Sequence, residues 1–416
     1  MFPKAAAFQS NSYGASGVGR GVRIGRRRSR VRNAGEVMGE FPVACLAEEI
    51  ETPGAGQIRA LITIAGNPVL STPNGDRLDA ALASLDFMVS FDIYLNETTR
   101  HADVILPGLS PLETEHFDAA FSQLAYRNAV RYSAPLFNAP LDQPAEWETL
   151  LRLTGIVTGQ GANPDVDALD DFIVTSQIQR AVADEHSPLH GRDPAEIFAA
   201  LDGKRGPERL LDLALRSGPL GDAFGARPDG LNLAKVKDAP HGIDMGALEP
   251  RLPEVLRTPS GKIEMAPEPV LADVERLRRS LSPAPANGMR LVGRRHLRSN
   301  NSWMHNLPLL AGGRARCTLY VHPADAERLG LKDGAQARVT SRAGSVELPV
   351  ELTDGIMPGV VSIPHGWGHD RPGAQLRVAA QRPGVNSNRL ADEMLIDPPS
   401  GNAVLNGIPV TVEAAG

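Results

Sequence analysis

Two short polar segments follow apolar runs, which is where a parallel α/β sheet places its ligand-binding loops. Gly66-Asn67-Pro68 follows the run 59–65, and Asp92 follows the run 87–91. A glycine lets backbone N–H groups approach a phosphate or a purine, and an asparagine amide both donates and accepts hydrogen bonds. The pair is therefore compatible with a nucleotide site. On spacing alone, a plain turn is the commoner explanation of the first segment, and a solvated or helix-capping aspartate explains the second equally well.

Of the ten histidines, only those of His365-Gly-Trp-Gly-His369 form a close pair. The i, i+4 spacing binds zinc when a helix carries it, but two glycines oppose a helix here and no glutamate lies between the histidines. We therefore interpret the segment as a glycine-rich loop in which Trp367 packs at the mouth of a barrel.

A second polar segment combines cationic, amide and hydroxyl groups. Arg294-Arg295-His296 is followed by Ser299-Asn-Asn-Ser302-Trp303-Met-His305, and Asn386-Ser-Asn388-Arg389 adds a similar group near the end of the chain. This composition suits an anionic ligand rich in heteroatoms, and an exposed polar loop explains it equally well.

Cysteine usage restricts the possible metal sites. Only Cys45 and Cys317 are present, whereas an iron–sulfur cluster normally takes four thiolates and a structural zinc takes four Cys or His ligands. We predict that this chain carries no iron–sulfur cluster and that both thiols are small buried residues. The lack of a disulfide framework and of a secretory signal predicts a cytoplasmic protein.

The overall composition is that of a globular protein. The 416 residues are 42% hydrophobic and 22% charged, with a net charge of −6, which excludes coiled coil, collagen and wholesale disorder. The sequence has no run of about 18 apolar residues, so it predicts no membrane span. The mild acidity argues against a nucleic-acid binder.

The N-terminus is basic and contains no acidic residue before Glu36. An organelle transit peptide and a basic nucleic-acid arm both fit this composition. We favour a disordered leader over residues 1–42, because glycines interrupt the arginine-rich stretch.

Periodicity predicts an α/β domain over residues 43–281. Strands at 59–65, 87–91 and 103–107 alternate with a helix at 76–85 and a short helix near Asn96, as in a parallel sheet. Further helices at 146–157, 172–184, 194–200 and 210–215 are expected to cover this sheet. A short strand at 263–265 and a helix at 271–281 follow.

A Pro-rich linker at 282–288 precedes a different pattern. Short alternating segments separated by turns predict a β-barrel over residues 289–416. Its strands are expected at 289–292, 317–322, 335–341, 346–352, 359–364 and 408–412, with one helix at 323–329.

Two segments carry a specific resemblance to a known family. AGNPVLSTPNG (65–75) and FDIYLNETTRHADVILP (91–107) resemble the molybdopterin oxidoreductases of the dimethyl-sulfoxide-reductase superfamily, close to the formate-dehydrogenase and nitrate-reductase branch. The segments 293–305, 322–331, 364–368 and 384–392 are similar to that family's C-terminal dinucleotide-binding barrel.

The resemblance implies a partial doubly wound sheet domain, followed by a six-stranded double-psi β-barrel. It further implies that the chain holds the guanosine and pterin ends of a bis-molybdopterin guanine dinucleotide, with molybdenum supplied through this cofactor. The residues that match the family's cofactor-binding motifs are Gly66, Asn67, Pro68, Asp92, Glu97, Thr98, Arg295, Ser302, Trp303, His305 and Asn388. No side chain of this sequence matches a catalytic residue or a metal ligand.

The chain departs from the family in one respect. A Cys-rich cluster segment and a protein ligand to the metal normally precede the portion that is similar. We therefore expect the C-terminal part of an oxidoreductase that works with a separate N-terminal subunit or upstream half. A non-catalytic cofactor-binding module and a truncated inactive product are the alternatives.

Overall fold

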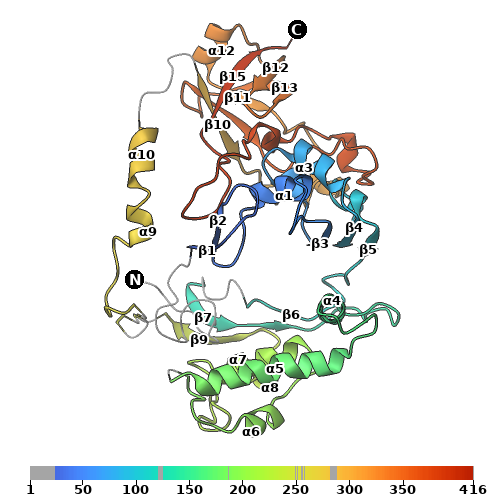
Figure 1. The fold of residues 1–416 in the computed structure, drawn as a ribbon, viewed down its shortest axis with the longest axis vertical. Coiled ribbons are helices and arrows are strands. Elements are labelled where there is room, and N and C mark those ends of the chain that lie inside the picture. The colour runs from blue at the N-terminus through green and yellow to red at the C-terminus, as the bar shows by residue number, and fades with distance from the viewer. Residues whose placement is uncertain are drawn as a thin grey trace. The chain divides into compact units, whose positions relative to one another are not determined.

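The computed structural model describes residues 24–119, 125–185, 187–248, 250, 252–253, 256, 258–281 and 288–415. The chain divides into two compact units (Figure 1). Of the described residues, those within 24–107 and 266–415 form one unit, and those within 108–265 form the other. The predicted domain over 43–281 does not coincide with either unit, because residues 108–265 belong to a unit of their own. The predicted linker lies almost wholly outside the described residues.

A three-stranded parallel sheet begins the first of these units. Its strands β3 (Ala60–Ile64), β4 (Phe87–Phe91) and β5 (Val104–Leu106) pair in this order, as predicted. The connection between β3 and β4 contains α2 (Pro68–Ser71) and α3 (Gly75–Leu82). Leu78 and Leu82 of α3 are buried against Met88 of β4, which is the apolar spacing that predicts this helix. After β4 the chain forms a 3-10 turn, η2 (Thr99–His101), where a short helix is predicted.

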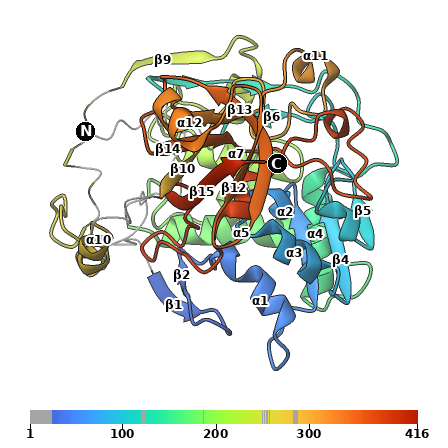
Figure 2. The ribbon, with the colours of Figure 1, turned by 90° about the horizontal axis from the view of Figure 1, so that it is seen from above.

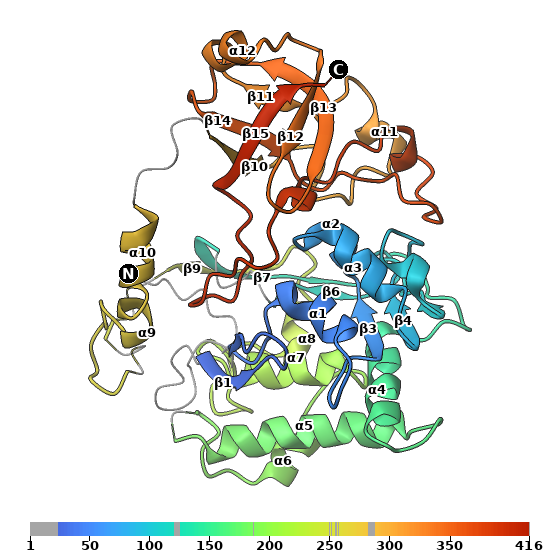
Figure 3. The ribbon, with the colours of Figure 1, turned by 45° about the horizontal axis from the view of Figure 1, so that its top comes forward.

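The six barrel strands all form near their predicted places. They are β10 (Met289–Arg294), β11 (Leu319–Val321), β12 (Gln336–Thr340), β13 (Ser345–Leu352), β14 (Val360–Pro364) and β15 (Ile408–Ala414). They close in the order β10-β14-β11-β13-β12-β15 (Figure 3). The pairs β10–β14 and β11–β13 are parallel and the remaining pairs are antiparallel. Because these parallel pairs interlock, the barrel is of the double-psi type.

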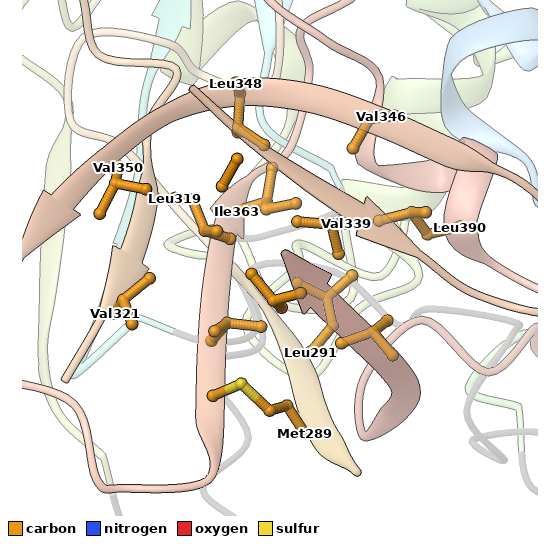
Figure 4. Packing of buried hydrophobic residues seen from close by; sticks show 14 of the residues in the cluster. Met289, Leu291, Leu319, Val321, Val339, Val346, Leu348, Val350, Ile363 and Leu390 are labelled. Atoms are coloured by element: carbon orange, nitrogen blue, oxygen red, sulfur yellow. The ribbon is translucent and has the colours of Figure 1, made fainter. Parts of the chain in front are cut away.

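The apolar side chains of alternating strand positions fill the barrel interior. Buried and exposed positions alternate along β12 and β13, because successive side chains of a strand point to opposite faces. The inward side chains pack against one another around Leu319 and Ile363, each 0% exposed (Figure 4). The helix α12 (Pro323–Leu329) begins at proline, as predicted.

The remaining elements of this unit are short. They are β1 (Ile24–Arg28), β2 (Gly35–Val37), η1 (Val43–Cys45), α1 (Leu46–Glu51), α9 (Glu268–Leu271), α10 (Val274–Ser280), α11 (Pro308–Ala311), η4 (Ala379–Gln381) and η5 (Ser387–Leu390). The predicted disordered leader is wrong for residues 24–42, because β1 and β2 pair as a hairpin. Glu36 and Glu48 neutralise Arg26 and Arg32 in ion pairs. Residues 1–23 of the predicted leader lie outside the described residues.

The other unit is largely helical. Its helices are α4 (Glu146–Val157), α5 (Val166–Ala183), α6 (Pro194–Ala199), α7 (Pro207–Arg216) and α8 (Leu233–Lys237). They are joined by two small antiparallel sheets, β6 (His116–Phe117) with β8 (Tyr132–Ser133) and β7 (Arg127–Val130) with β9 (Ile243–Ala247).

These helices have an apolar core of their own, which includes Val174, Ile178 and Leu213. The four predicted helices all form, but α5 and α7 begin earlier than predicted and α8 was not predicted. The predicted strand at 263–265 is absent from the described part of this segment, which forms bends. In the part of the chain that the structure describes, no helix is long and apolar enough to cross a membrane.

Truncating the barrel core should destabilise this unit strongly. Leu319→Ala removes a fully buried side chain, and such a cavity typically costs about 2–5 kcal/mol. Leu309→Ala is the matched control, because Leu309 is 89% exposed. Hydrogen exchange of the barrel strands in increasing urea measures both. Similar losses in the two variants would show that the interior of the barrel does not determine its stability.

Candidate functional site

The carboxyl edge of the parallel sheet meets one end of the barrel within a single unit. The loops after β3 and β4 contact the loops that follow β14 and precede η5, through His369 with Glu97 and Asn386 with Val69. Figures 2 and 3 show α2 and α3 beside the barrel. The Asn388 amide donates to the Leu70 carbonyl at 2.7 Å, and the Asn74 N–H donates to the Asn388 carbonyl at 3.0 Å. An ion pair of 2.7 Å joins Arg389 to Asp76 at the start of α3. The sheet loops and barrel loops therefore form one continuous surface.

A buried chain of polar side chains crosses this junction. Glu97 Oε1 lies 2.9 Å from His369 Nδ1, and His369 Nε2 lies 2.9 Å from His305 Nδ1. His305 Nε2 then lies 2.8 Å from Ser299 Oγ. None of the four residues is more than 4% exposed. The chain begins in the loop after β4, passes through the loop after β14 and ends in the loop after β10.

The same carboxylate is joined to the predicted nucleotide loop. The Asn67 amide donates to Glu97 Oε2 at 2.7 Å, and the Thr98 hydroxyl donates to Asn67 Oδ1 at 2.7 Å. Thr98 also accepts from the Val69 N–H, in the first turn of α2. The loops after β3 and β4 are thus fixed against each other by side chains that are mostly buried.

Electrostatics favours one ionisation state for Glu97 and His305 in this row of buried side chains. Burial alone would raise the pKa of Glu97, but bonding to His369 and Asn67 holds it below its ordinary value. Burial, followed by the effect of His369, lowers the pKa of His305 to about 4. Glu97 is therefore ionised and His305 neutral near neutral pH.

The glycine-rich loop 365–369 lies at the barrel mouth, as predicted. Trp367 belongs to the barrel core, and the His305 ring stacks on it at a centroid distance of 4.0 Å. Gly366 has a φ of +89°, and a Cβ at this position would lie 2.1 Å from the Asn301 carbonyl oxygen. Only glycine therefore allows the two loops to approach so closely. Within the described residues no group of side chains is arranged to hold a metal ion.

Arginines gather at the same end of the barrel. Burial lowers the pKa of Arg316, and the positive charges of Arg298, Arg382 and Arg314 lower it further. Burial and the charges of Arg316 and other arginines likewise lower the pKa of His296. Among the described residues, the side chains of Arg295 and Arg298 have neither a hydrogen bond nor an ion pair. This cluster would gain from an anion, which would relieve the repulsion among its charges.

The predicted site residues divide into two groups. In one group the polar atoms already bind protein partners: Asn67, Glu97, Thr98 and His305 are joined in the buried chain, and Asn388 donates to the sheet. Asp92 accepts from the Tyr94 N–H and the Asn96 amide of its own loop. Gly66 and Pro68 lie in the loop and first turn before them.

The other group is available to a ligand. Arg295 is exposed and unpaired, Trp303 is 70% exposed, and Ser302 is half-buried beside it. Several of the predicted site residues therefore hold the loops in place, and the others remain free to bind a ligand.

Two residues of the buried chain were not singled out as site residues. His369 was noticed only as half of an unlikely metal pair, and Ser299 only as part of a polar loop. Their role depends on a contact between residues 272 positions apart, Glu97 and His369, which spacing does not reveal. The available signal was a histidine that follows a glycine in the loop after a predicted strand.

Gly366→Ala should separate close packing from backbone strain. The matched control is Gly359→Ala, because Gly359 has a similar φ of +80° but open space around a Cβ. The control should show only the strain of a left-handed residue, about 1–2 kcal/mol. Gly366→Ala should cost about 1–3 kcal/mol more, because the loop at Asn301 must move. Equal losses of unfolding free energy would contradict the close approach of the two loops.

Comparisons with known proteins agree with this architecture. Residues 289–409 match the Molydopterin dinucleotide binding domain, and residues 5–154 match the Molybdopterin oxidoreductase family. The alpha subunit of F420-dependent formate dehydrogenase 1 from Methanococcus maripaludis is 23% identical over 74% of this chain and 38% of its own length. Dimethyl sulfoxide/trimethylamine N-oxide reductase from Rhodobacter capsulatus is 23% identical over 79% of this chain and 39% of its own length.

A solved structure is similar as well. Acetylene hydratase from Pelobacter acetylenicus has a TM-score of 0.57 and 17% identity, over 90% of this chain and 46% of its own length. The chain thus spans less than half the length of each of these three proteins. The two family matches, together with the parallel sheet and the closed double-psi barrel, show that this chain belongs to the molybdopterin oxidoreductases of the dimethyl-sulfoxide-reductase superfamily.

Proposed function

We propose that this chain binds a molybdopterin guanine dinucleotide and forms the C-terminal, cofactor-holding part of a molybdenum oxidoreductase. The observation that supports it most directly is the arginine cluster beside the junction of sheet and barrel, in which the Arg298 side chain has neither a hydrogen bond nor an ion pair among the described residues. When bound, the cofactor supplies two-electron oxygen-atom or hydride transfer at its molybdenum. The chain itself binds and orients the group.

The donor set fits the anionic part of this cofactor. Arg295 and Arg298 are free to bind phosphate oxygens, and guanidinium groups suit such oxygens because they donate in pairs. Trp303 offers an exposed aromatic face, and Ser302 offers a hydroxyl in the same loop. We assign these four residues to the pyrophosphate and pterin side of the cofactor.

The sheet loops fit the guanosine end. Gly66 and Asp92 follow neighbouring parallel strands, where α/β sheets bind nucleotides. Asp92 is half-buried and already accepts two hydrogen bonds, but each carboxylate oxygen has a further lone pair. It can therefore accept from a guanine edge, which presents adjacent N–H donors that adenine lacks. Asn67, Glu97 and Thr98 hold the loops in place rather than reaching the base.

A complete enzyme would need further protein groups. The chain spans less than half of its relatives' length, so we propose that a separate N-terminal subunit or an upstream half supplies the metal ligand and any iron–sulfur cluster. Cys45 and Cys317 are both buried, and burial raises the pKa of each thiol, which supports the prediction that this chain holds no cluster. A cytoplasmic location remains our proposal.

Asp92→Asn should reduce the preference of the chain for guanine over adenine. It replaces an acceptor by a donor, so GDP affinity should fall about ten- to a hundredfold. Calorimetric titration of GDP and ADP measures the ratio, and Asp86→Asn at the other end of β4 is the control. If the substitution only loosened the loop, the affinities for GDP and ADP would fall equally. An unchanged GDP-to-ADP ratio would remove Asp92 from the base site.

Arg295→Ala should weaken binding through the phosphates. Loss of one charge-assisted contact should reduce GDP affinity about tenfold and leave the guanine-to-adenine ratio unchanged. Arg338→Ala is the control, because this arginine lies elsewhere on the barrel and pairs with Glu347. Affinity should also fall with added salt in the wild type and less steeply in the variant. Equal affinities for wild type and Arg295→Ala would contradict a phosphate site at this end of the barrel.

A further inference from the structure

We propose that Glu97, His369, His305 and Ser299 form a buried clasp with one fixed direction of hydrogen bonding, which positions the barrel loop 299–305 against the sheet. The clasp is defined by three contacts of 2.8–2.9 Å between residues of three separate loops. It depends only on protein groups, so it holds whether or not the cofactor proposal is correct.

Charge and chemistry fix the direction of the clasp. An ionised Glu97 can only accept, so His369 donates to it from Nδ1. The proposed clasp has both rings neutral, so that His369 accepts at Nε2. His305 must then donate from Nδ1 to His369, and its own Nε2 accepts from the Ser299 hydroxyl. Both rings are therefore Nδ1–H tautomers, and every polar atom of the chain has a partner.

At its Glu97 end, the clasp holds loops together and does not relay protons. The second oxygen of Glu97 accepts a hydrogen bond from the Asn67 amide nitrogen, which cannot take up a proton and pass it on. Asn67 in turn accepts from Thr98, which binds the backbone of α2. The clasp therefore extends from the nucleotide loop of the sheet to the barrel loop that carries Trp303.

The clasp can hold one added proton but not two. One proton fits on His369 if His305 changes tautomer and donates to Ser299. A second proton would place N–H groups face to face across the 2.9 Å contact between the rings. Burial, His369, Arg316 and His296 oppose the protonation of His305, and only a hydrogen bond with the Gly366 backbone favours it.

Acid should therefore destabilise the folded unit. His305 is neutral in the folded state down to about pH 4, but the same group titrates near 6.5 when unfolded. The unfolded chain thus binds more protons between these values, so stability is lost as pH falls from 6.5 towards 4. The lowered pKa of Glu97 acts in the same direction below its ordinary value of 4.5.

Nitrogen-15 NMR of the histidine-labelled full chain tests the direction of the clasp. The signals of His305 and His369, identified by their loss in His305→Gln and His369→Gln, should show Nδ1–H tautomers at pH 7. Their imidazole protons should exchange slowly with water. An Nε2–H tautomer at neutral pH, or rapid exchange at either ring, would overturn the proposal.

A pair of compensating variants tests whether the donor pattern itself matters. Glu97→Gln places an amide donor against the Asn67 amide, and Asn67→Asp places a carboxylate against Glu97, 2.7 Å away in the wild type. The double variant exchanges the two groups and restores every donor–acceptor pair, including those with His369 and Thr98. Each single variant should speed imidazole exchange about tenfold or more, and the double variant should recover most of this protection. Additive losses, or no loss in the single variants, would show that the contacts do not act as a clasp.

Discussion

A carboxylate with no exposure to water must receive hydrogen bonds from its surroundings, and Glu97 imposes this requirement on the junction of sheet and barrel. Its partners come from both sides, since His369 belongs to a barrel loop and Asn67 to the loop after β3. Removing one of these donors leaves a buried carboxylate oxygen without a hydrogen bond, which typically costs about 1–3 kcal/mol or more. The relative position of the two loops is therefore strictly defined, and so is the surface that they form.

This constraint explains why several family-like motif residues bind protein partners. Asn67, Glu97, Thr98 and His305 use their polar atoms on one another. The groups left over are different in kind: unpaired arginines, an exposed tryptophan and a half-buried serine. The site is thus built from an inner network that fixes the loops and an outer set that can bind an anion.

The sequence predicted local structure well, because local structure follows from periodicity. The helices at 146–157 and 323–329 and the strand at 87–91 begin and end where predicted, and all six barrel strands form. It failed where the outcome depends on long-range contacts. The arginines of residues 24–42 looked like a disordered leader, yet Glu36, Glu48 and Glu49 neutralise three of them in an ordered hairpin. His369 likewise acquires its role from Glu97, which no local pattern connects to it.

The most direct test of this account is the nucleotide content of the protein itself. The full chain would be purified from cells that make the molybdopterin guanine dinucleotide and then hydrolysed in acid, and the released nucleotides would be separated by chromatography. The account predicts stoichiometric GMP together with the oxidised pterin. Only background GMP, or AMP released in equal amount, would contradict a guanine dinucleotide site in this chain.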